Sequence, residues 1–403
     1  MSAPVGRDVV LFSSADWGDR YWTNKQHTAV RLAARGYRVL YVESVGIRRP
    51  GLNALDLRRI VGRIRRGLAP IREVSKNVWL MSPLTIPVGH RHAFVGALNR
   101  WLLQSRIGRW LKRRDAKRPI VWTYHPYMLA LADALQPGAI VYHSVDDLGA
   151  IPNVDHAAYD AAEVKLLQRA DHVFVTSRAL YDRCVATAGA RTHYFNNVAD
   201  IDHFGTARNA AALPADLDAI PHPRLMYIGA LSDFKLDFTM IAEIAAAKPE
   251  WHFVFIGDER EGQHSEDIAR LAQRPNAHFL GWRAYAELPD YLRGADVALL
   301  PQQINDYTRS MFPMKFFEYL AAGLPIVATP LPALAEFSEY HHVAANAEQF
   351  IAAVESALQA PERLPLDHPI LRANSWDARL DAMLATIDGQ AAGVSATGGG
   401  GVG

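Results

Sequence analysis

Strand-like and helical segments alternate along the chain, and this alternation most constrains the fold. Short apolar runs rich in β-branched and aromatic residues are bounded by polar or turn residues, which is typical of buried strands. Helix-length segments lie between them, such as 22–36, where Gly36 is placed to end a helix. The pattern predicts parallel sheets with helices on both faces. Six such runs lie in the first half of the chain: residues 8–14, 37–44, 78–83, 119–125, 139–145 and 172–177.

A second series of strands follows an alanine-rich, proline-punctuated stretch, residues 205–223, which is typical of a linker. Since the chain has 403 residues and single cores stop growing at roughly 250–300, we expect two doubly wound, Rossmann-like parallel-sheet domains. Their predicted extents are 1–205 and 206–373, then a helix at 374–388, with packing back on the first domain as one option, and a disordered glycine-rich tail at 389–403.

Composition bounds the class of protein. Half of the residues are apolar and 21% are charged, as in an ordinary globular protein. The single cysteine, Cys184, cannot close an internal disulfide, and no run approaches the roughly 18–20 apolar residues of a membrane-spanning helix. The first residues do not resemble a signal peptide. We therefore expect a cytoplasmic protein whose membrane contact is at most peripheral, on the inner face.

The net charge of +1 hides an uneven distribution. Residues 1–120 carry 24 Lys and Arg against seven Asp and Glu, and the rest of the chain is acidic. The positive charge concentrates in residues 46–72 and 100–118, where apolar side chains recur at helical spacing. Such segments bind anionic lipid or nucleic acid, or they are solvated helix faces. We expect an anionic membrane surface as the partner, a solvated face as the close alternative, and no nucleic acid.

The most informative motif is MFPMKFFEYLAAGLPIVAT, residues 311–329. Pro313 lies near a helix start, and Lys315 and Glu318 are three residues apart and so share a helix face. The lysine and the helix N-terminus suit a diphosphate, whereas the two oxygens of Glu318 suit the adjacent hydroxyls of a ribose. The alternative is a surface ion pair that contributes little.

This segment resembles the donor-site signature of GT-B glycosyltransferases, especially family-4-like enzymes that build bacterial surface polysaccharides of the teichuronic acid or exopolysaccharide type. The resemblance extends over most of the chain, in the family's order and spacing. It implies a GT-B fold, in which a first, acceptor-side domain and a second, donor domain face each other across a cleft. Its other motifs are YIGAL with a following lysine (227–235), FIGD (255–258), HFLGW and its continuation (278–301), ADHVFVTS (170–177) and NNVADIDHF (196–204).

The resemblance implies a set of donor-binding residues. Glu318 would hold the donor ribose, and Lys315 and Lys235 would face the diphosphate. Gly229 would allow close approach of the backbone to phosphate, and Arg283 would lie near the base.

Two features depart from the family pattern. Ser310 takes the place in the donor site where a second glutamate is usual, and an arginine usually found before Lys235 is missing. The carboxylate that orients the sugar is therefore absent or comes from elsewhere, and the resemblance implies neither the donor sugar nor the stereochemistry.

In the first domain, residues 123–127 and 141–150 follow buried strands where the cleft would open. We expect His125 to contact the donor sugar or phosphate, with a structural hydrogen bond as the alternative. Asp146 or Asp147 is the candidate general base for an acceptor hydroxyl. Adjacent side chains on an extended segment diverge, so we expect no metal site there.

We therefore predict a glycosyltransferase that moves a sugar from a nucleotide diphosphate sugar to a glycan or lipid-linked acceptor at the cytoplasmic membrane face, with no cofactor and no metal. The alternatives are a nucleotide-sugar epimerase of the same fold and a two-domain sugar-binding protein without activity. A nicotinamide dehydrogenase is disfavoured, because no Gly-x-Gly-x-x-Gly follows the first strand of either domain.

Overall fold

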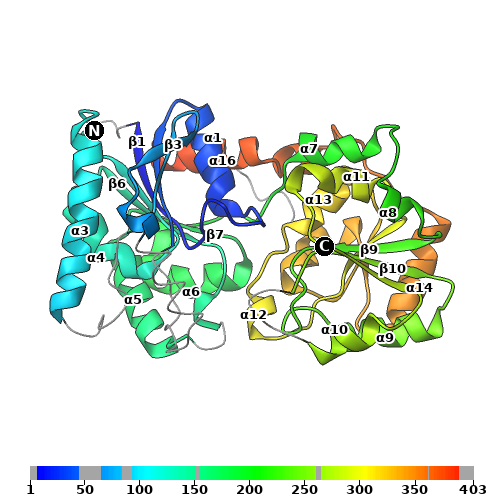
Figure 1. The fold of residues 1–403 in the computed structure, drawn as a ribbon. Helices are drawn as coiled ribbons and strands as arrows, with labels where there is room; N and C mark the ends of the chain where they lie inside the picture. Colours follow the sequence, from blue (N-terminus) through cyan, green and yellow to red (C-terminus); the bar gives the residue numbers. More distant parts are fainter. Residues whose placement is uncertain are drawn as a thin grey trace, which may run out of the picture.

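The computed structural model describes residues 7–44, 65–83, 93–150, 154–259, 265–361 and 363–389. Two α/β domains lie side by side, each built on one sheet with helices on both faces (Figure 1). The predicted fold class is confirmed. Most of the first predicted basic segment, residues 46–64, and the glycine-rich tail from residue 390 onward lie outside the described residues.

The first sheet has eight strands in the order β3-β4-β2-β1-β5-β6-β7-β8. All neighbouring strands run parallel except β3, which pairs antiparallel with β4 at the edge. The six predicted runs are all strands. β3 and β8 were not predicted because β3 is largely exposed and β8 has only three residues, of which one is buried, so neither contains a buried apolar run. The bounds are β1 Asp8–Phe12, β2 Arg38–Val42, β3 Arg72–Ser75, β4 Val78–Met81, β5 Ile120–Thr123, β6 Ala139–Ser144, β7 His172–Val175 and β8 Thr192–Tyr194.

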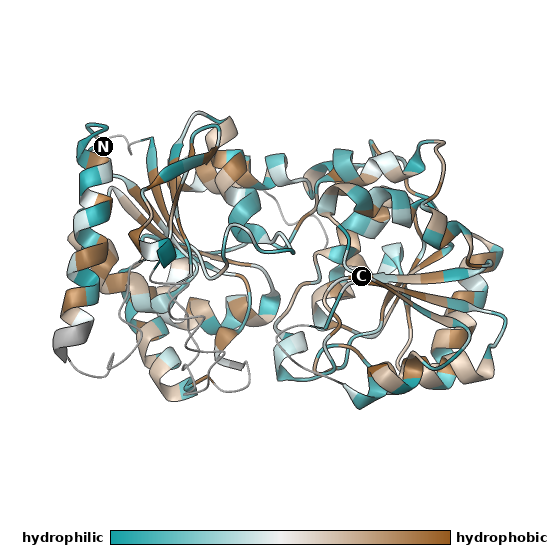
Figure 2. Ribbon diagram, viewed as in Figure 1, coloured by the Kyte–Doolittle hydropathy of each residue, from teal (hydrophilic) through white to brown (hydrophobic). Residues whose placement is uncertain are grey.

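Helices cover both faces of this sheet, which explains why its central strands are apolar on both sides (Figure 2). One face packs against α3, α4, α5 and α6, and the other against α1 and the C-terminal helix α16. Within the described ranges, no helix is both long and apolar enough to cross a membrane. The bounds are α1 Asn24–Ala34, α3 Ala93–Lys112, α4 Leu129–Ala134, α5 His156–Arg169, α6 Arg178–Ala188 and α16 Trp376–Ile387.

The second sheet has six parallel strands in the order β11-β10-β9-β12-β13-β14. The five predicted runs are confirmed, and the two-residue β14 was missed. The strands are β9 Arg224–Ile228, β10 His252–Ile256, β11 Ala277–Gly281, β12 Val297–Leu300, β13 Ile326–Ala328 and β14 His342–Val343. The helices are α7 Ile201–Gly205, α8 Ala215–Asp218, α9 Phe238–Ala247, α10 Glu266–Leu271, α11 Leu288–Leu292, α12 Asp306–Arg309, α13 Lys315–Ala322, α14 Ala347–Gln359 and α15 Pro369–Ala373.

The predicted linker at residues 205–223 is part of the second domain, so the linker interpretation is wrong. It contains α8, and Ala207, Leu217 and Ile220 are buried in the core that surrounds α13. Alanine and proline are frequent in linkers, but here they flank apolar residues that are buried against the second-domain core, which is formed by residues far along the chain.

Helix α16 returns the chain to the first domain, as one of the sequence-based options had it (Figure 1). Its residues Leu380, Met383 and Ile387 are buried against the first sheet. Arg35 of α1 donates to Asp377 at 3.0 Å and to Asp381 at 2.6 Å. The chain therefore passes between the domains twice.

Candidate active site

Helix α13 forms the centre of the candidate donor site. It begins at Lys315, just after Pro313, and ends at Gly323, whose φ of 79° is the left-handed conformation that favours glycine. Phe316 and Phe317 are fully buried in the second-domain core. This packing holds the first turn of α13 close to the carboxyl ends of the sheet strands. Within this turn the backbone N–H of Phe316 donates to the Pro313 carbonyl at 3.1 Å.

The lysine and glutamate of the motif form a buried ion pair. Lys315 Nζ lies 2.8 Å from Glu318 Oε2, and Glu318 is only 2% exposed. A carboxylate in such a place is costly unless it is paired, so the surface ion-pair alternative does not describe this site. Burial, followed by the nearby carboxylates of Glu318 and Asp200, raises the pKa of the Tyr285 phenol. Among the described residues, none donates a hydrogen bond to Glu318 Oε1, which leaves this oxygen for a ligand hydroxyl.

Two glycines shape the strand ends next to α13. Gly229 follows β9 with a φ of 149°, and Gly257 follows β10 with a φ of 148°. A Cβ on Gly257 would lie 1.8 Å from the carbonyl oxygen of Gly229, so only glycine fits there. The family resemblance predicts that Gly229 lets the backbone approach phosphate, and this role stays a prediction. The sequence contained Gly257 within FIGD, but no role could be read from the motif alone.

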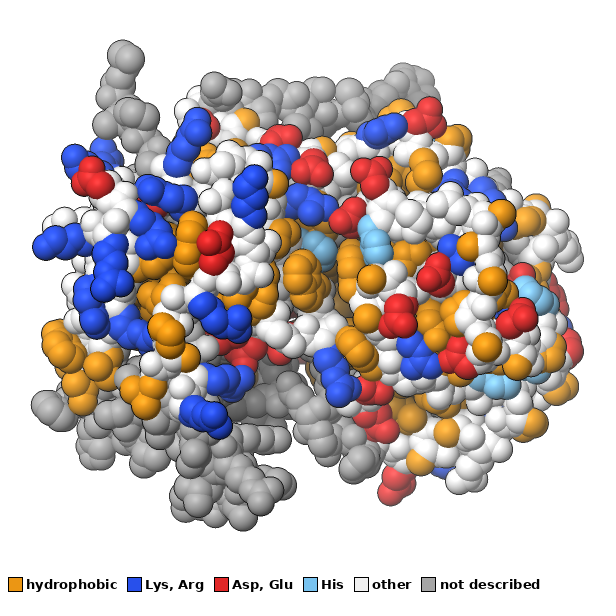
Figure 3. Space-filling model, turned by 45° about the horizontal axis from the view of Figure 1, so that its top comes forward, with side chains coloured by type: hydrophobic (Ala, Val, Ile, Leu, Met, Phe, Trp, Pro, Cys, Tyr) orange, Lys and Arg blue, Asp and Glu red, His pale blue; other side chains and the backbone are white. Residues whose placement is uncertain are grey.

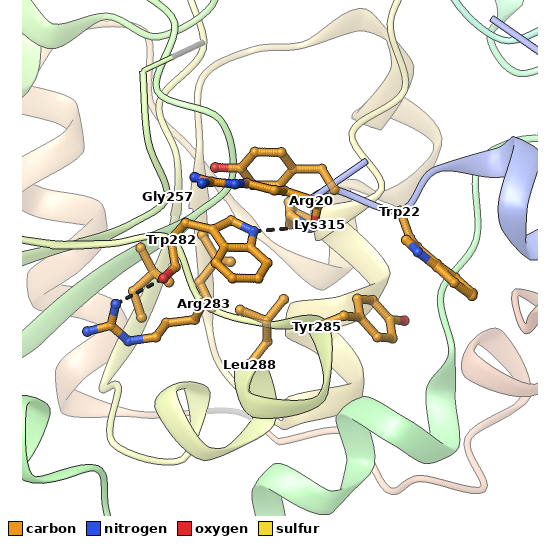
Figure 4. A pocket seen from close by; sticks show the side chains of 11 residues that line it. Arg20, Trp22, Gly257, Trp282, Arg283, Tyr285, Leu288 and Lys315 are labelled. Atoms are coloured by element: carbon orange, nitrogen blue, oxygen red, sulfur yellow. Dashed lines mark hydrogen bonds between the residues drawn. The ribbon is translucent and has the colours of Figure 1, made fainter. Parts of the chain in front are cut away.

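A pocket lies between these strand ends and the connection from β1 to α1 (Figure 4). Its free volume is about 30 Å³, which suffices for water only, because pockets for small-molecule ligands measure roughly 300–1,000 Å³. The second domain contributes Gly257, Trp282, Arg283, Tyr285, Leu288 and Lys315, among others. The first domain contributes Arg20, Tyr21 and Trp22.

The first-domain side of the pocket is held by a set of polar contacts. Arg20 Nη1 lies 2.8 Å from Asp258 Oδ2, and its guanidinium lies 5.3 Å from the centre of the Trp282 ring. Trp282 Nε1 in turn donates to the Arg20 carbonyl at 3.2 Å, and the Tyr21 hydroxyl accepts from Asp258 N at 2.9 Å. The connection that carries Arg20 and Tyr21 thus closes the pocket. No sequence signal could have identified these contacts, because their partners lie about 240 residues away.

His125 follows β5 and is 2% exposed. Its Nδ1 accepts from the backbone N–H of Tyr127 at 3.3 Å, so the proton of the neutral ring is on Nε2, which has no partner among the described residues. Burial lowers the pKa of His125 to about 4, so the ring is neutral at physiological pH. A buried N–H donor without a partner is rare, and a ligand oxygen would satisfy it.

The two candidate aspartates face different partners, as expected for adjacent side chains. Asp147 Oδ2 lies 2.7 Å from Arg183 Nη1, within a first-domain network that also includes Glu163. Asp146 Oδ1 accepts from the hydroxyl of Tyr307, in the second domain, at 3.3 Å. Asp146 is therefore the one that faces the domain boundary. In the part of the chain that the structure describes, no three His, Cys, Asp or Glu side chains gather as metal ligands.

Lys235 and Ser310 lie on the second-domain side of the same boundary. Lys235 Nζ donates to the Tyr307 hydroxyl at 3.2 Å and lies 4.6 Å from the centre of that ring. The Ser310 carbonyl accepts from Ser177 Oγ of the first domain at 2.8 Å. Neither residue lines the pocket, and both lie along the domain boundary. That Lys235 faces the donor diphosphate stays a prediction.

Arg283 lines the pocket, but its guanidinium is already engaged. It lies 2.5 Å from Asp216 Oδ2, and its Nε donates to the Tyr291 hydroxyl at 2.5 Å. Hydrogen bonds to Tyr291 and Asp216 raise the pKa of the Arg283 guanidinium. The base-binding role of Arg283 stays a prediction.

Comparison with known sequences supports a transferase. Residues 222–360 match the family model described as "Glycosyl transferases group 1". Over 207 residues the chain is 32% identical to TuaH of Bacillus subtilis (strain 168), which is named as a teichuronic acid biosynthesis glycosyltransferase. The match covers 49% of this chain and 51% of TuaH, so the chain spans about half the length of this curated relative.

Comparison with solved structures covers nearly the whole chain and shows the fold. Sucrose-phosphate synthase from Thermosynechococcus elongatus matches with a TM-score of 0.69 at 17% identity, over 94% of this chain and 98% of that one. HepE of Anabaena, in complex with UDP-glucose, matches with a TM-score of 0.61 at 14% identity, over 94% and 99%. The predicted GT-B fold and the predicted resemblance to glycosyltransferases are confirmed.

Proposed function

We propose that this chain, which has the GT-B fold and a group 1 glycosyl transferase region in its second domain, is a glycosyltransferase that uses a nucleotide diphosphate sugar as donor. The observation that carries the proposal is the buried pair of Lys315 and Glu318 beside the pocket at the strand ends. A buried carboxylate and a cation at the N-terminus of a helix suit a ligand that carries both phosphates and a diol. Since HepE is in complex with UDP-glucose, uridine diphosphate is the first nucleotide to test.

In this proposal the second domain holds the nucleotide. Glu318 accepts hydrogen bonds from the ribose hydroxyls, and Lys315 and the first turn of α13 stabilise the diphosphate. Gly229 and Gly257 let the phosphates approach the backbone at the ends of β9 and β10, where a side chain would not fit. The face of Trp282, now covered by Arg20, would accept the base.

The first domain would supply the groups that act on the sugar and the acceptor. The acceptor oxygen attacks the anomeric carbon, and the diphosphate leaves with the electron pair of the broken C–O bond. Lys315 stabilises the charge that develops on the diphosphate. Asp146 would take the acceptor proton in a direct displacement, whereas the leaving phosphate would take it in a retaining, front-face route. The Nε2–H of His125 would donate to an oxygen of the sugar or the phosphate.

We propose a glycan or a lipid-linked sugar as acceptor, which would place the reaction at the cytoplasmic face of the membrane. The support is the match to a protein named for teichuronic acid biosynthesis, together with the basic character of residues 1–120.

A thermal-shift titration with UDP, followed by product analysis with UDP-glucose, tests the proposed function. A ligand at 100 times its dissociation constant stabilises the native state by about 2.7 kcal/mol, so a clear rise in melting temperature is expected. No shift with UDP or any other nucleoside diphosphate would contradict the donor site. Conversion of UDP-glucose to its epimer without any acceptor would identify an epimerase instead.

The closed pocket leads to a prediction about nucleotide affinity. Arg20→Ala removes an ion pair and a cation–π contact that hold the first-domain connection over Trp282. Both contacts must break before a nucleotide enters, so their loss is expected to tighten UDP binding by about fivefold, measured by calorimetric titration.

Arg270→Ala is the matched control, because Arg270 also forms an exposed ion pair, with Asp267, but lies on α10 outside the pocket lining. UDP affinity should not change in this variant. Weaker UDP binding by Arg20→Ala would show that Arg20 contributes to the bound state rather than to the closed one.

A further inference from the structure

Helix α3 lies on the side of the first domain that is turned away from the second domain (Figure 1). A second pocket lies along this helix. Lys and Arg side chains gather on this side of the molecule, with few acidic side chains among them (Figure 3). The pocket has a free volume of about 430 Å³, which is in the range of ligand sites. It lies between α3, the edge strands β3 and β4, and the segment of residues 67–71.

Arg106 fixes one wall of this pocket. Its Nη2 donates to the carbonyl of Ala69 at 2.7 Å, and its Nη1 donates to the carbonyls of Gly67 and, at 3.3 Å, Ser82. One arginine of α3 thereby holds the 67–71 segment against the helix. The backbone carbonyls of this wall already accept hydrogen bonds from Arg106. A ligand in the pocket would therefore contact polar side chains rather than these carbonyls.

Arg114 lies against two tryptophan rings, Trp79 and Trp110, whose centres are 5.6 Å apart in an edge-on contact. Its guanidinium carbon lies 4.4 Å from the centre of the Trp79 ring and 4.3 Å from that of Trp110. Trp110 is also 3% exposed. These ring faces are therefore occupied, and nucleic-acid bases cannot stack on them, which argues against single-stranded nucleic acid as the ligand.

Arg109 and Arg113 bring charge to the pocket that no carboxylate of the described residues neutralises. Neither forms an ion pair with any residue of the described ranges. The one acidic residue of the lining is Glu73, and its Oε1 accepts from the backbone N–H of Asn77 at 2.8 Å. Four arginines thus face one carboxylate, and the pocket attracts an anion.

Large apolar side chains are exposed beside this charge. Leu68, in the pocket lining, is 68% exposed, and Trp101 on α3 is 61% exposed. Trp101 precedes Arg109 by eight residues, about 12 Å along the helix axis. Basic groups flanked by an exposed tryptophan and an exposed leucine match a membrane interface, where cations meet phosphates and apolar side chains enter below them.

We infer that this pocket binds the phosphate headgroup of an anionic phospholipid, through Arg109 and Arg113, while Leu68 and Trp101 enter the interface. The site goes beyond the proposed transferase activity and does not depend on it. The nucleotide site lies at the other domain's strand ends, so failure of one proposal leaves the other testable.

Vesicle sedimentation of the full chain tests this site. The wild-type protein should bind vesicles of phosphatidylcholine with phosphatidylglycerol and should not bind phosphatidylcholine alone. Arg109→Gln combined with Arg113→Gln should weaken the binding about thirtyfold, the loss of two basic contacts at about 1 kcal/mol each. The melting temperature and UDP binding should stay at wild-type values.

Arg100→Gln combined with Lys112→Gln is the matched control. It removes the same charge from exposed positions of the same helix, but neither residue lines the pocket. This variant should lose less than threefold in vesicle binding. An equal loss in the two double variants would show diffuse attraction and overturn the pocket.

Two further outcomes would overturn the lipid assignment. Binding of inorganic phosphate that requires Arg109 and Arg113, without binding to anionic vesicles, would make this a site for free phosphate. Binding of single-stranded RNA with the same requirement, again without vesicle binding, would make it a nucleic-acid site. Leu68→Ser combined with Trp101→Ser should weaken vesicle binding but leave phosphate binding unchanged.

Discussion

Asp146→Asn is expected to lower the rate of sugar transfer by about 10²–10⁴, the usual contribution of a general base. Asp146 faces the second domain, where the Tyr307 hydroxyl donates to it at 3.3 Å. It lies outside the pocket lining, so the affinity for UDP should stay within twofold of wild type. Measurements of kcat with UDP-glucose and of the UDP dissociation constant separate these two effects.

Asp147→Asn is the matched control for this experiment. Asp147 pairs with Arg183 at 2.7 Å inside the first domain, so its substitution should lower the melting temperature rather than the rate of transfer. Transfer at the wild-type rate by Asp146→Asn would show that Asp146 is not the base. The leaving phosphate would then be the proton acceptor that remains.

His125→Ala should also lower turnover. The affinity for UDP should be kept if Nε2–H donates to the transferred sugar, which UDP lacks, and should fall if it donates to a phosphate oxygen. Since burial lowers the pKa of His125 to about 4, the ring stays neutral above about pH 5. A fall in kcat between pH 7 and pH 5 should therefore be the same in the wild type and in this variant. If kcat falls between pH 7 and pH 5 in the wild type but not in His125→Ala, the proposal that His125 acts as a neutral ring is contradicted.

Glu318→Ala is expected to weaken UDP binding by about 1.5–3 kcal/mol, or roughly 10- to 150-fold, the range for hydrogen bonds to charged groups. The carboxylate is 2% exposed and has one oxygen left for a ligand hydroxyl. Calorimetric titration of the folded variant measures the loss. Lys315 keeps a route to solvent, with 24% of its side chain exposed, so the variant should still fold.

A comparison of nucleotides sharpens this prediction. If Glu318 accepts hydrogen bonds from the ribose, removing the 2′-hydroxyl should weaken binding to the wild-type protein but not to Glu318→Ala. Glu318→Gln keeps the shape of the side chain and removes its charge. The affinity that it loses with the deoxynucleotide should lie between the losses of the wild type and of Glu318→Ala. Equal losses from the deoxynucleotide in wild type and variant would place Glu318 away from the ribose.

The alternation of strands and helices could be predicted from the sequence because it depends on local periodicity. Buried parallel strands are continuous apolar runs, and eleven such runs correspond to eleven strands. The strands β3, β8 and β14 were missed because they have four residues or fewer and are partly exposed. The 205–223 stretch was mistaken for a linker because the burial of Leu217 depends on a core formed by residues far along the chain.

For the candidate site too, some features follow from the spacing of residues in the sequence and others only from tertiary packing. The spacing of Lys315 and Glu318 by itself determined that they share one face of a helix, since three residues make nearly one turn. Whether that face is exposed was decided by tertiary packing, which leaves Glu318 2% exposed. Likewise, adjacent positions determined that Asp146 and Asp147 diverge, but only the fold decided which one faces the second domain.

The sequence by itself determined the class of fold, the order of its elements and the basic character of residues 1–120, because each depends on residue type and local spacing. Only the tertiary structure decided that Arg20 lies against Trp282, that Arg114 lies against Trp79 and Trp110, and that Arg109 and Arg113 line the same pocket. Such contacts depend on which surfaces meet when the two sheets and their helices pack. No local sequence pattern predicts these contacts, because the free energy of burying a surface depends on both surfaces that meet, and they lie far apart in the sequence.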